Sequence, residues 1–574
     1  MWIQNYDPTG HWWLSTAIAA VPIVVLLGLL VSEKVGAWQS AVAGLVAAMA
    51  LAVGVFGMPA RMALAAAGFG VVFALIRIIW LIVAAVFLYD IAVKTGQFDV
   101  MKRSIAKLSG DRRLQAVLVA FSFGAFIEGA AGFGAPVAIS AAFLVGLGFR
   151  PFQAAVLCLI ANTAPVAWGS IGTPIRTLAT VTGLNVEHLS ATSGRILPLL
   201  SVIIPFWLVK TMASWRETFA VWPALLTMGG TFAVVQFAWS NFVGFELVDL
   251  VAAVASLVAG AGLLLVWKPR TEWRFPEDAA RDAMAPETGH EALTPGRVAK
   301  AWMPFALLSL MVLVWGLPPI RGIRSTKERL DTFTMKAMAA VTGRAAVPEK
   351  TIKLPMESLH LKVAKGEAVT GHLPGDKDRE KAEMDLVPLS ATGTAVFLAA
   401  VISGLLLGVG PIVQVKVLLG TIRRLIPAMA AILAMLSLGF VTKYSGMDAV
   451  LGLAFTRTGA ILYPIFGTLL GWLGVALTGS DTSSNVLFGN LQTITARKLD
   501  LNPVLMASAN TTGGVMGKMI DAQSIVVAAA ATGENGKEGD ILRAVFWHSL
   551  ALAGLVGAIV WVYAHVLPGV VVGP

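Results

Sequence analysis

Charged residues are scarce in this sequence. Asp, Glu, Lys and Arg make up 13% of its 574 residues, and 57% are hydrophobic, whereas about 25% of residues in soluble domains are charged. Apolar runs of about 18 residues or more, long enough to cross a bilayer as helices, recur from end to end. In the bilayer core such runs must form helices or closed barrels, and their length favours helices. The composition therefore predicts a polytopic membrane protein.

The residues that many enzyme sites need are also scarce or wrongly spaced. Cys158 is the only cysteine, so one chain can form neither a disulfide nor a cysteine metal cluster. The seven histidines include no HExxH motif, and the turn around Ser170 has no GxSxG motif, so zinc-protease and serine-hydrolase patterns are absent. Segment 513–519, GGVMGKM, ends like a phosphate loop but has no Ser or Thr after its lysine. We expect neither an enzyme nor a bound cofactor or metal.

The net charge of +10 does not indicate nucleic-acid binding. The basic residues lie in short segments between apolar runs, as positive-inside topology predicts. The strongest cytoplasmic marker is segment 101–113 (MKRSIAKLSGDRR), with five basic residues and one acid. Counting three spans back from this cytoplasmic segment places the N-terminus outside, and the uncharged C-terminal tail is expected outside too. The expected partner of the apolar surface is the lipid bilayer.

The pattern of apolar runs predicts an all-α fold with about 12 transmembrane helices plus two re-entrant helical hairpins. The expected parts are 1–113 (three spans), 114–217 (a hairpin plus a broken helix), 218–319 (linking spans around a cytoplasmic loop, 268–300), 320–387 (a polar external insert) and 388–574 (the second half).

Two regions match each other. Each has one lone acid in a long apolar stretch, Glu128 or Asp481. An Asn-Thr pair follows the acid after roughly 30 residues, and a glycine lies seven residues after that Asn. The first copy lies in 114–217 and starts on the cytoplasmic side, whereas the second, 459–567, starts outside. Opposite orientation of two copies is the inverted-topology repeat of many secondary transporters.

Gly, Asn and Pro are expected to interrupt the helices of both copies. The expected breaks are at Asn162–Pro165 and Gly169–Pro174 in the first copy and at Asn510–Gly514 in the second. A helix that begins again at membrane depth exposes N–H groups with partial positive charge, which attract an anion. Small polar side chains at the breaks could bind a small solute or simply satisfy the broken backbone. The candidate binding residues are Gly129, Asn162, Thr163, Ser170, Gly479, Ser480, Thr482, Ser483, Asn510, Thr511, Lys518, Gln523 and Ser524.

Three cations lie in apolar surroundings. Lys518 is the best placed to bind a substrate carboxylate, but it could equally pair with Asp521, three residues on. Arg77 and Arg176 are further candidate charge partners, for the anion or for a buried acid.

Glu128 and Asp481 are the candidate proton carriers. A lone carboxylate at membrane depth costs about 2.5–3.5 kcal/mol on insertion scales and so marks a pathway. Because burial favours the neutral carboxyl group, either residue could take up a proton during transport. Asp481 could also cap a helix, since it lies in the segment GSDTSS.

Four long segments resemble signature segments of the bacterial L-lactate permease family. They are FIEGAAGFGAPVAI (126–139), LIANTAPVAWGSIG (159–172), LTGSDTSSNVLFGNLQ (477–492) and ANTTGGVMGKMIDAQSI (509–525). The resemblance implies a bacterial inner-membrane symporter that imports L-lactate, and often glycolate or related 2-hydroxymonocarboxylates, with protons. Another small carboxylate, a passive anion channel and a homo-oligomer are alternatives that the sequence leaves open.

Overall fold

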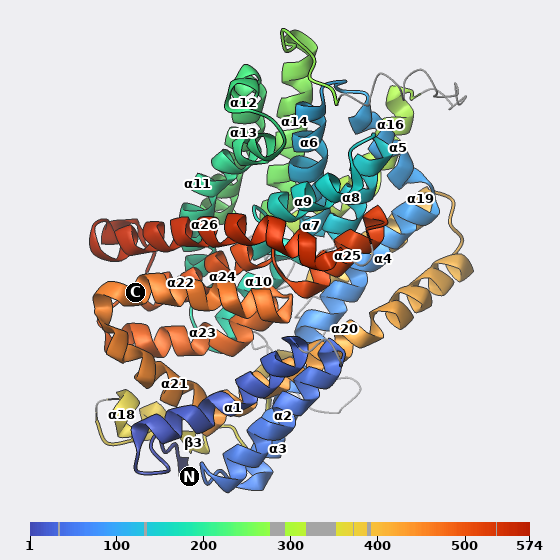
Figure 1. Ribbon diagram of the computed structural model, residues 1–574. Coiled ribbons are helices and arrows are strands. Elements are labelled where there is room, and N and C mark those ends of the chain that lie inside the picture. The colour runs from blue at the N-terminus through green and yellow to red at the C-terminus, as the bar shows by residue number, and fades with distance from the viewer. Residues whose placement is uncertain are drawn as a thin grey trace, which may run out of the picture. The chain divides into compact units, whose positions relative to one another are not determined.

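A computed structural model describes residues 1–31, 35–130, 135–275, 293–316, 352–370, 372–386, 392–534 and 537–573. The described residues are mostly helical (Figure 1). They form two compact units, each drawn from separated stretches of sequence. Unit 1 comprises Met1–Ile91, Ala306–Tyr463 and Asn485–Pro503, and unit 2 comprises Ala92–Phe305, Pro464–Ser484 and Val504–Pro574.

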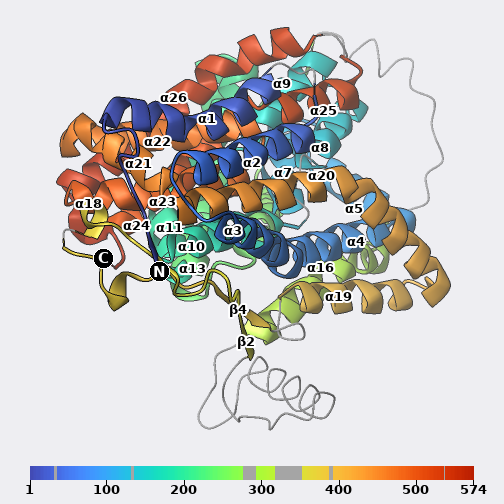
Figure 2. The same ribbon diagram turned by 90° about the horizontal axis from the view of Figure 1, so that it is seen from below.

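Long apolar helices dominate unit 1. Helices α1 (Trp12–Val31), α2 (Ala37–Gly54) and α20 (Pro411–Ser445) lie side by side (Figure 2). Gly70 lets α3 approach the backbone of α20, because a Cβ at this position would lie 2.5 Å from the Cα of Ser437. The other helices that begin in this unit are α3 (Ala60–Phe73), η1 (Ala74–Ile79), α4 (Trp80–Lys94), α18 (Glu367–Thr370), η4 (Asp376–Asp378), α19 (Thr392–Leu406), α21 (Met447–Phe455), η5 (Thr456–Thr458) and α22 (Gly459–Thr478).

Four short strands, which the sequence did not predict, also belong to unit 1. Strand β1 (Trp2–Ile3) pairs in parallel with β3 (Val363–Ala364), and β2 (Ile352–Pro355) pairs antiparallel with β4 (Glu383–Leu386). Three of them lie in the predicted polar insert, whose residues 320–351 are outside the described part of the chain. Strand β3 therefore joins the described part of the insert to the N-terminal strand.

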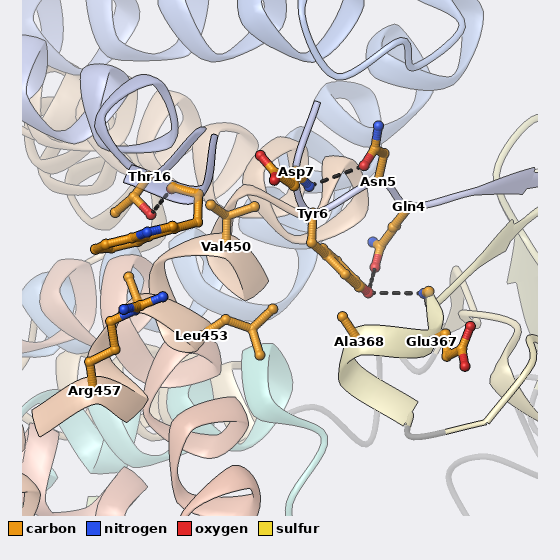
Figure 3. A pocket seen from close by; sticks show the side chains of 13 residues that line it. Gln4, Asn5, Tyr6, Asp7, Thr16, Glu367, Ala368, Val450, Leu453 and Arg457 are labelled. Carbon is orange, nitrogen blue, oxygen red and sulfur yellow. Dashed lines mark hydrogen bonds between the residues drawn. The ribbon is translucent and has the colours of Figure 1, made fainter. Parts of the chain in front are cut away.

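A pocket of about 450 Å³ lies between the N-terminal segment, α18 and α21 of unit 1 (Figure 3). The guanidinium of Arg457 lies 3.6 Å from the ring centroid of Trp12. The Tyr6 hydroxyl donates to Oε1 of Gln4 at 2.8 Å and accepts from the Gly366 N–H at 3.1 Å. Burial raises the pKa of Tyr6 to about 12, so this hydroxyl remains a donor at neutral pH. These contacts fasten the N-terminal segment to the insert.

Unit 2 contains most of the helices around the predicted repeats. Helices α11, α13 and α14 pack side by side (Figure 1). Helix α24 (Pro503–Gly517) begins at the last residue of unit 1 and continues in unit 2. The elements that begin in unit 2 are α5 (Gln97–Ala106), α6 (Arg112–Ala116), η2 (Val117–Phe123), α7 (Gly124–Ala130), α8 (Ala135–Gly146), α9 (Pro151–Ala161), η3 (Val166–Trp168), α10 (Gly169–Thr182), α11 (Val186–Met212), α12 (Trp215–Ala220), α13 (Trp222–Phe242), α14 (Val248–Val266), α16 (Pro295–Gly316), α23 (Asp481–Lys498), α25 (Ala522–Thr532), α26 (Glu538–His565) and η6 (Pro568–Val570).

Two packed helical arms flank the lone acid of the first copy, where the sequence predicts a hairpin. Helix α6, the π-helical segment η2 and α7 form one continuous buried helix, 112–130. Helix α8 packs back along it, with the rings of Phe123 and Phe143 5.9 Å apart. The glycine-rich residues 131–134, where the sequence predicts the turn, lie outside the described residues.

Among the described residues, six helical stretches are long and apolar enough to cross a membrane, or seven if the bent pair α9 and 166–182 counts as one. Five shorter apolar helices accompany them. The chain is therefore a multi-pass helical membrane protein. The count of about 12 spans and the re-entrance of the hairpins stay predictions.

Candidate functional site

The first copy breaks where the sequence predicted. Helix α9 ends before Asn162, the chain turns, and the axes of α9 and 166–182 differ by 67°. Ser170, Ile171 and Gly172 follow with φ of 45°, 58° and 74°. A β-branched residue such as Ile171 rarely adopts this left-handed conformation, which costs about 1–3 kcal/mol per residue. Strain of this kind persists only where the surrounding packing enforces it.

Glu128 faces this break from α7. Its side chain is 4% exposed, and a Cβ at Gly169 would lie 2.6 Å from its Oε1 atom. Asn162 lies close enough to interact with the carboxyl group. Neither polar side-chain atom of Asn162 makes a well-formed hydrogen bond within the described part of the chain. Glu128 therefore lies inside protein, beside a buried amide with capacity for a further partner.

The second copy breaks elsewhere than predicted. Helix α24 runs without interruption from Pro503 to Gly517, so the break expected at Asn510–Gly514 is wrong. The chain leaves the helix at Lys518–Asp521, before α25 begins.

The glycines of α24 serve close packing instead. A Cβ at Gly513 or Gly517 would overlap backbone carbonyl oxygens of α22, those of Thr468 and Trp472. Glycine on such a face lets two helix backbones approach closely, as in small-residue helix contacts within membranes. The two helices accordingly lie next to each other (Figure 1).

Lys518 lies in the second break and is nearly buried. Its Nζ donates to the backbone oxygen of Gly479 at 2.6 Å and lies 3.3 Å from Oδ2 of Asp521. Oδ1 of Asp521 accepts the N–H of Ser524 at 2.7 Å and so caps α25. The pair expected as neighbours on one helix face thus forms in the loop between two helices. The charges of Lys518 and Asp521 also act on Glu128, so both breaks border one cluster within unit 2.

Asp481 begins α23 but is not the residue whose side chain caps it. Oγ of Ser480 accepts the N–H of Ser483 at 3.3 Å and takes that role. Asp481 instead points toward α24, where its Oδ2 accepts a hydrogen bond from the hydroxyl of Thr511. Lys518 thus interacts with Glu128 and also binds the backbone of Gly479, two residues before Asp481.

Several candidate binding residues have structural partners. The Thr163 hydroxyl donates to the oxygen of Ile160 at 2.7 Å, and Nδ2 of Asn510 donates to Oγ of Ser484 at 3.4 Å. Gly129 lets α7 approach α14, since a Cβ there would lie 2.8 Å from the backbone nitrogen of Leu250. The candidates Ser170, Ser483 and Ser524 are buried in unit 2, whereas Ser480 and Thr482 are half-buried.

Of the other predicted charges, Arg176 forms an ion pair with Glu246 at 2.7 Å and stacks over Phe245 at 4.8 Å. It therefore offsets an acid that the sequence prediction did not consider. The side chains of Arg77 and Gln523 lie outside the described part of the structure.

The sequence analysis missed Asp249. This residue lies in the first turn of α14, is 0% exposed and interacts electrostatically with Glu128. Neither carboxylate oxygen makes a well-formed hydrogen bond among the described residues, although Gln236 and the backbone of Trp168 lie nearby. A lone acid in the apolar span 248–266 was the available clue. Within the described ranges, no group of three His, Cys, Asp or Glu residues could hold a metal ion.

Comparison with known proteins identifies the family of this chain. The family model described as L-lactate permease matches residues 15–567. The glycolate permease GlcA of Escherichia coli is 43% identical, with 100% of this chain and 99% of the relative covered. An L-lactate permease of Salmonella typhimurium is 41% identical, with 99% of each chain covered. A solved structure of Neisseria gonorrhoeae MtrF covers 88% of this chain and 84% of its own, at 14% identity and a TM-score of 0.39, too low to establish a shared fold. Permeases move a solute without converting it, and this chain, a transporter rather than an enzyme, belongs to the L-lactate permease family.

Proposed function

We propose that this protein imports L-lactate, glycolate or a related 2-hydroxymonocarboxylate by proton symport. The observation that carries the proposal is the cluster of Glu128, Asn162 and Lys518 at two helix breaks. The names of the relatives, lactate and glycolate permeases, support the substrate class.

In the proposed mechanism the anion binds between the two breaks. Lys518 and the amide of Asn162 attract its carboxylate, aided by the partial positive charge where the helices resume. Asp481, held by Thr511, is the second candidate proton carrier. A proton on Glu128 removes a negative charge next to the bound anion. The substrate-loaded site then carries one charge fewer as the substrate crosses the membrane, which lowers the desolvation cost.

The proposed setting is the bacterial cytoplasmic membrane, with both termini outside. The basic segment 101–113 supports this orientation. The proposal includes about 12 spans and two re-entrant hairpins in an inverted repeat, the build of many secondary transporters. The Glu128 hairpin and the two breaks support that architecture.

Uptake by reconstituted protein tests the proposal. Vesicles that contain the purified chain and have an alkaline interior should accumulate labelled L-lactate above its outside concentration, and a protonophore should abolish the accumulation. The variant Glu128→Gln should lose accumulation but still exchange labelled for unlabelled lactate. The matched control Glu217→Gln, a capping residue of α12, should behave as wild type.

Two results would point to the alternatives. Equilibration of lactate without accumulation in wild-type vesicles would indicate a passive anion channel. Competition by succinate as strong as that by lactate would indicate a different carboxylate as the natural substrate.

A further inference from the structure

The first helix break runs between two buried acids. On one side, Glu128 of α7 lies against Gly169, where a Cβ would approach its Oε1 to 2.6 Å. On the other side, Asp249 of α14 lies near the backbone of Trp168, the preceding residue. The two carboxyl groups are 4% and 0% exposed and interact with each other. Helices α7 and α14 are locked together next to them, because Gly129 leaves no room for a side chain against Leu250.

Among the described residues, no cation hydrogen-bonds to either carboxylate oxygen of Asp249. The elements packed against α14 are α7, α10, α13 and η2. Their sequences contain two charged residues, Glu128 on α7 and Arg176 on α10, and Arg176 binds Glu246 at 2.7 Å. On the far side of Glu128, Lys518 pairs with Asp521. The only titratable group in the sequence of α9 is the thiol of Cys158.

Two buried carboxylates without a dedicated cation cannot both stay ionised. Like charges held close together in a medium of low dielectric constant share a proton and titrate as a pair. Well-formed hydrogen bonds to Oε2 of Glu128 and to both oxygens of Asp249 are lacking among the described residues, so these atoms have capacity to hold a proton between them or through water.

We propose that Glu128 and Asp249 form a carboxyl pair that holds one shared proton, and that the transported proton is the second proton this pair accepts. With one proton the pair bears one negative charge; the second proton arrives from outside, neutralises the pair as the substrate anion binds, and leaves to the inside after the anion. The proposal rests on the proposed symport, and it adds Asp249 as a proton-sharing residue of the site.

The variant Asp249→Asn tests this pair, since an amide has the same shape but cannot titrate. In the wild type the first proton already neutralises one carboxyl group, and the shared proton stabilises the remaining negative charge. An amide at position 249 donates a weaker hydrogen bond to that charge, so Glu128 should become easier to protonate. The pH of half-maximal gradient-driven lactate uptake should therefore move toward alkaline by about one unit, a tenfold change in proton concentration. The control Asp448→Asn makes the same change at a buried acid of α21 in unit 1 and should leave this pH unchanged. If Asp249 only fills space, its variant will have the wild-type pH profile.

Infrared spectroscopy of the purified full chain reads the shared proton without transport. A protonated-carboxyl stretching band at neutral pH should be lost or shifted in both Glu128→Gln and Asp249→Asn and be retained in Asp448→Asn. If wild-type vesicles fail to accumulate lactate but this band responds as expected, the symport proposal fails while the proton-sharing pair stands. An Asp249→Asn variant with an unchanged band and an unchanged pH profile would overturn the pair.

Discussion

Removal of Lys518 should destabilise the protein through the acid left behind. The Lys518 and Asp521 side chains are 6% and 0% exposed and 3.3 Å apart. Breaking a buried ion pair by deleting one partner typically costs about 3–5 kcal/mol, because the other charge stays buried and uncompensated. We therefore expect Lys518→Met to lower the free energy of unfolding by about 3–5 kcal/mol. In Lys518→Met/Asp521→Asn most of this loss should be recovered, because Asn caps a helix about as well as Asp.

The only cysteine supplies the assay. Cys158 is 2% exposed, so a thiol-reactive dye added to the detergent-solubilised protein should react only as the chain unfolds. The matched control is Lys537→Met, which removes an exposed lysine from a pair with Glu534 at 2.6 Å and should change stability little. Wild-type stability of Lys518→Met would refute the view that this ion pair holds the second break together.

The same double variant separates the pair from substrate binding. If Lys518 also holds the substrate carboxylate, Lys518→Met/Asp521→Asn should regain stability but not affinity. A hydrogen bond to a charged group contributes about 1.5–3 kcal/mol, so lactate should bind about 10- to 150-fold more weakly. Equilibrium binding of labelled lactate measures this difference. Wild-type affinity in the double variant would assign Lys518 a purely structural role.

Three further predictions follow from single contacts. Asn162→Ala should weaken the binding of labelled lactate without lowering stability, because the amide makes no well-formed hydrogen bond within the described residues. Equal loss of affinity and of stability would contradict a binding role. Gly471→Val should prevent folding or abolish uptake, since even a Cβ there would overlap the backbone of Asn510, whereas Gly554→Val, with open space around its position in α26, should express and transport normally. The backbone N–H of Ser214 donates a hydrogen bond to Oε2 of Glu217, and this contact is the main reason why the pKa of Glu217 lies below its usual value. The stability that it adds is complete above the unfolded-state pKa and is lost as pH falls through the lower folded-state pKa. Glu217→Gln should therefore flatten the acid limb of a stability-against-pH curve, and an unchanged acid limb would contradict this.

The hydropathy pattern and one isolated charge predicted most of the helices of unit 2 and the position of Glu128 within them. A long apolar run permits little besides a helix, and Glu128 was identifiable because no other charge lies near it in the sequence. The break around Asn162 followed from Asn, Pro and Gly in succession, where backbone bonds of a helix are hardest to maintain.

The parts that the sequence did not predict depend on contacts distant along the chain. The glycines after Asn510 suggested a break, but α22 packs against them, so the helix continues and ends at Gly517. The sequence analysis did not single out Asp249, since only folding places it near Glu128. Strands β2 and β4 have four residues each. Their alternation of apolar and polar residues is too short to stand out, and their pairing joins residues far apart in the sequence.

Proton movement during lactate uptake tests the role of Glu128 most directly. In weakly buffered vesicles, addition of lactate to wild-type protein should make the outside solution alkaline as protons enter with the anion. The variant Glu128→Gln should exchange labelled lactate at the wild-type rate and leave the outside pH unchanged. Lactate-dependent alkalinisation of equal size in the variant would contradict the assignment of the coupling proton to Glu128.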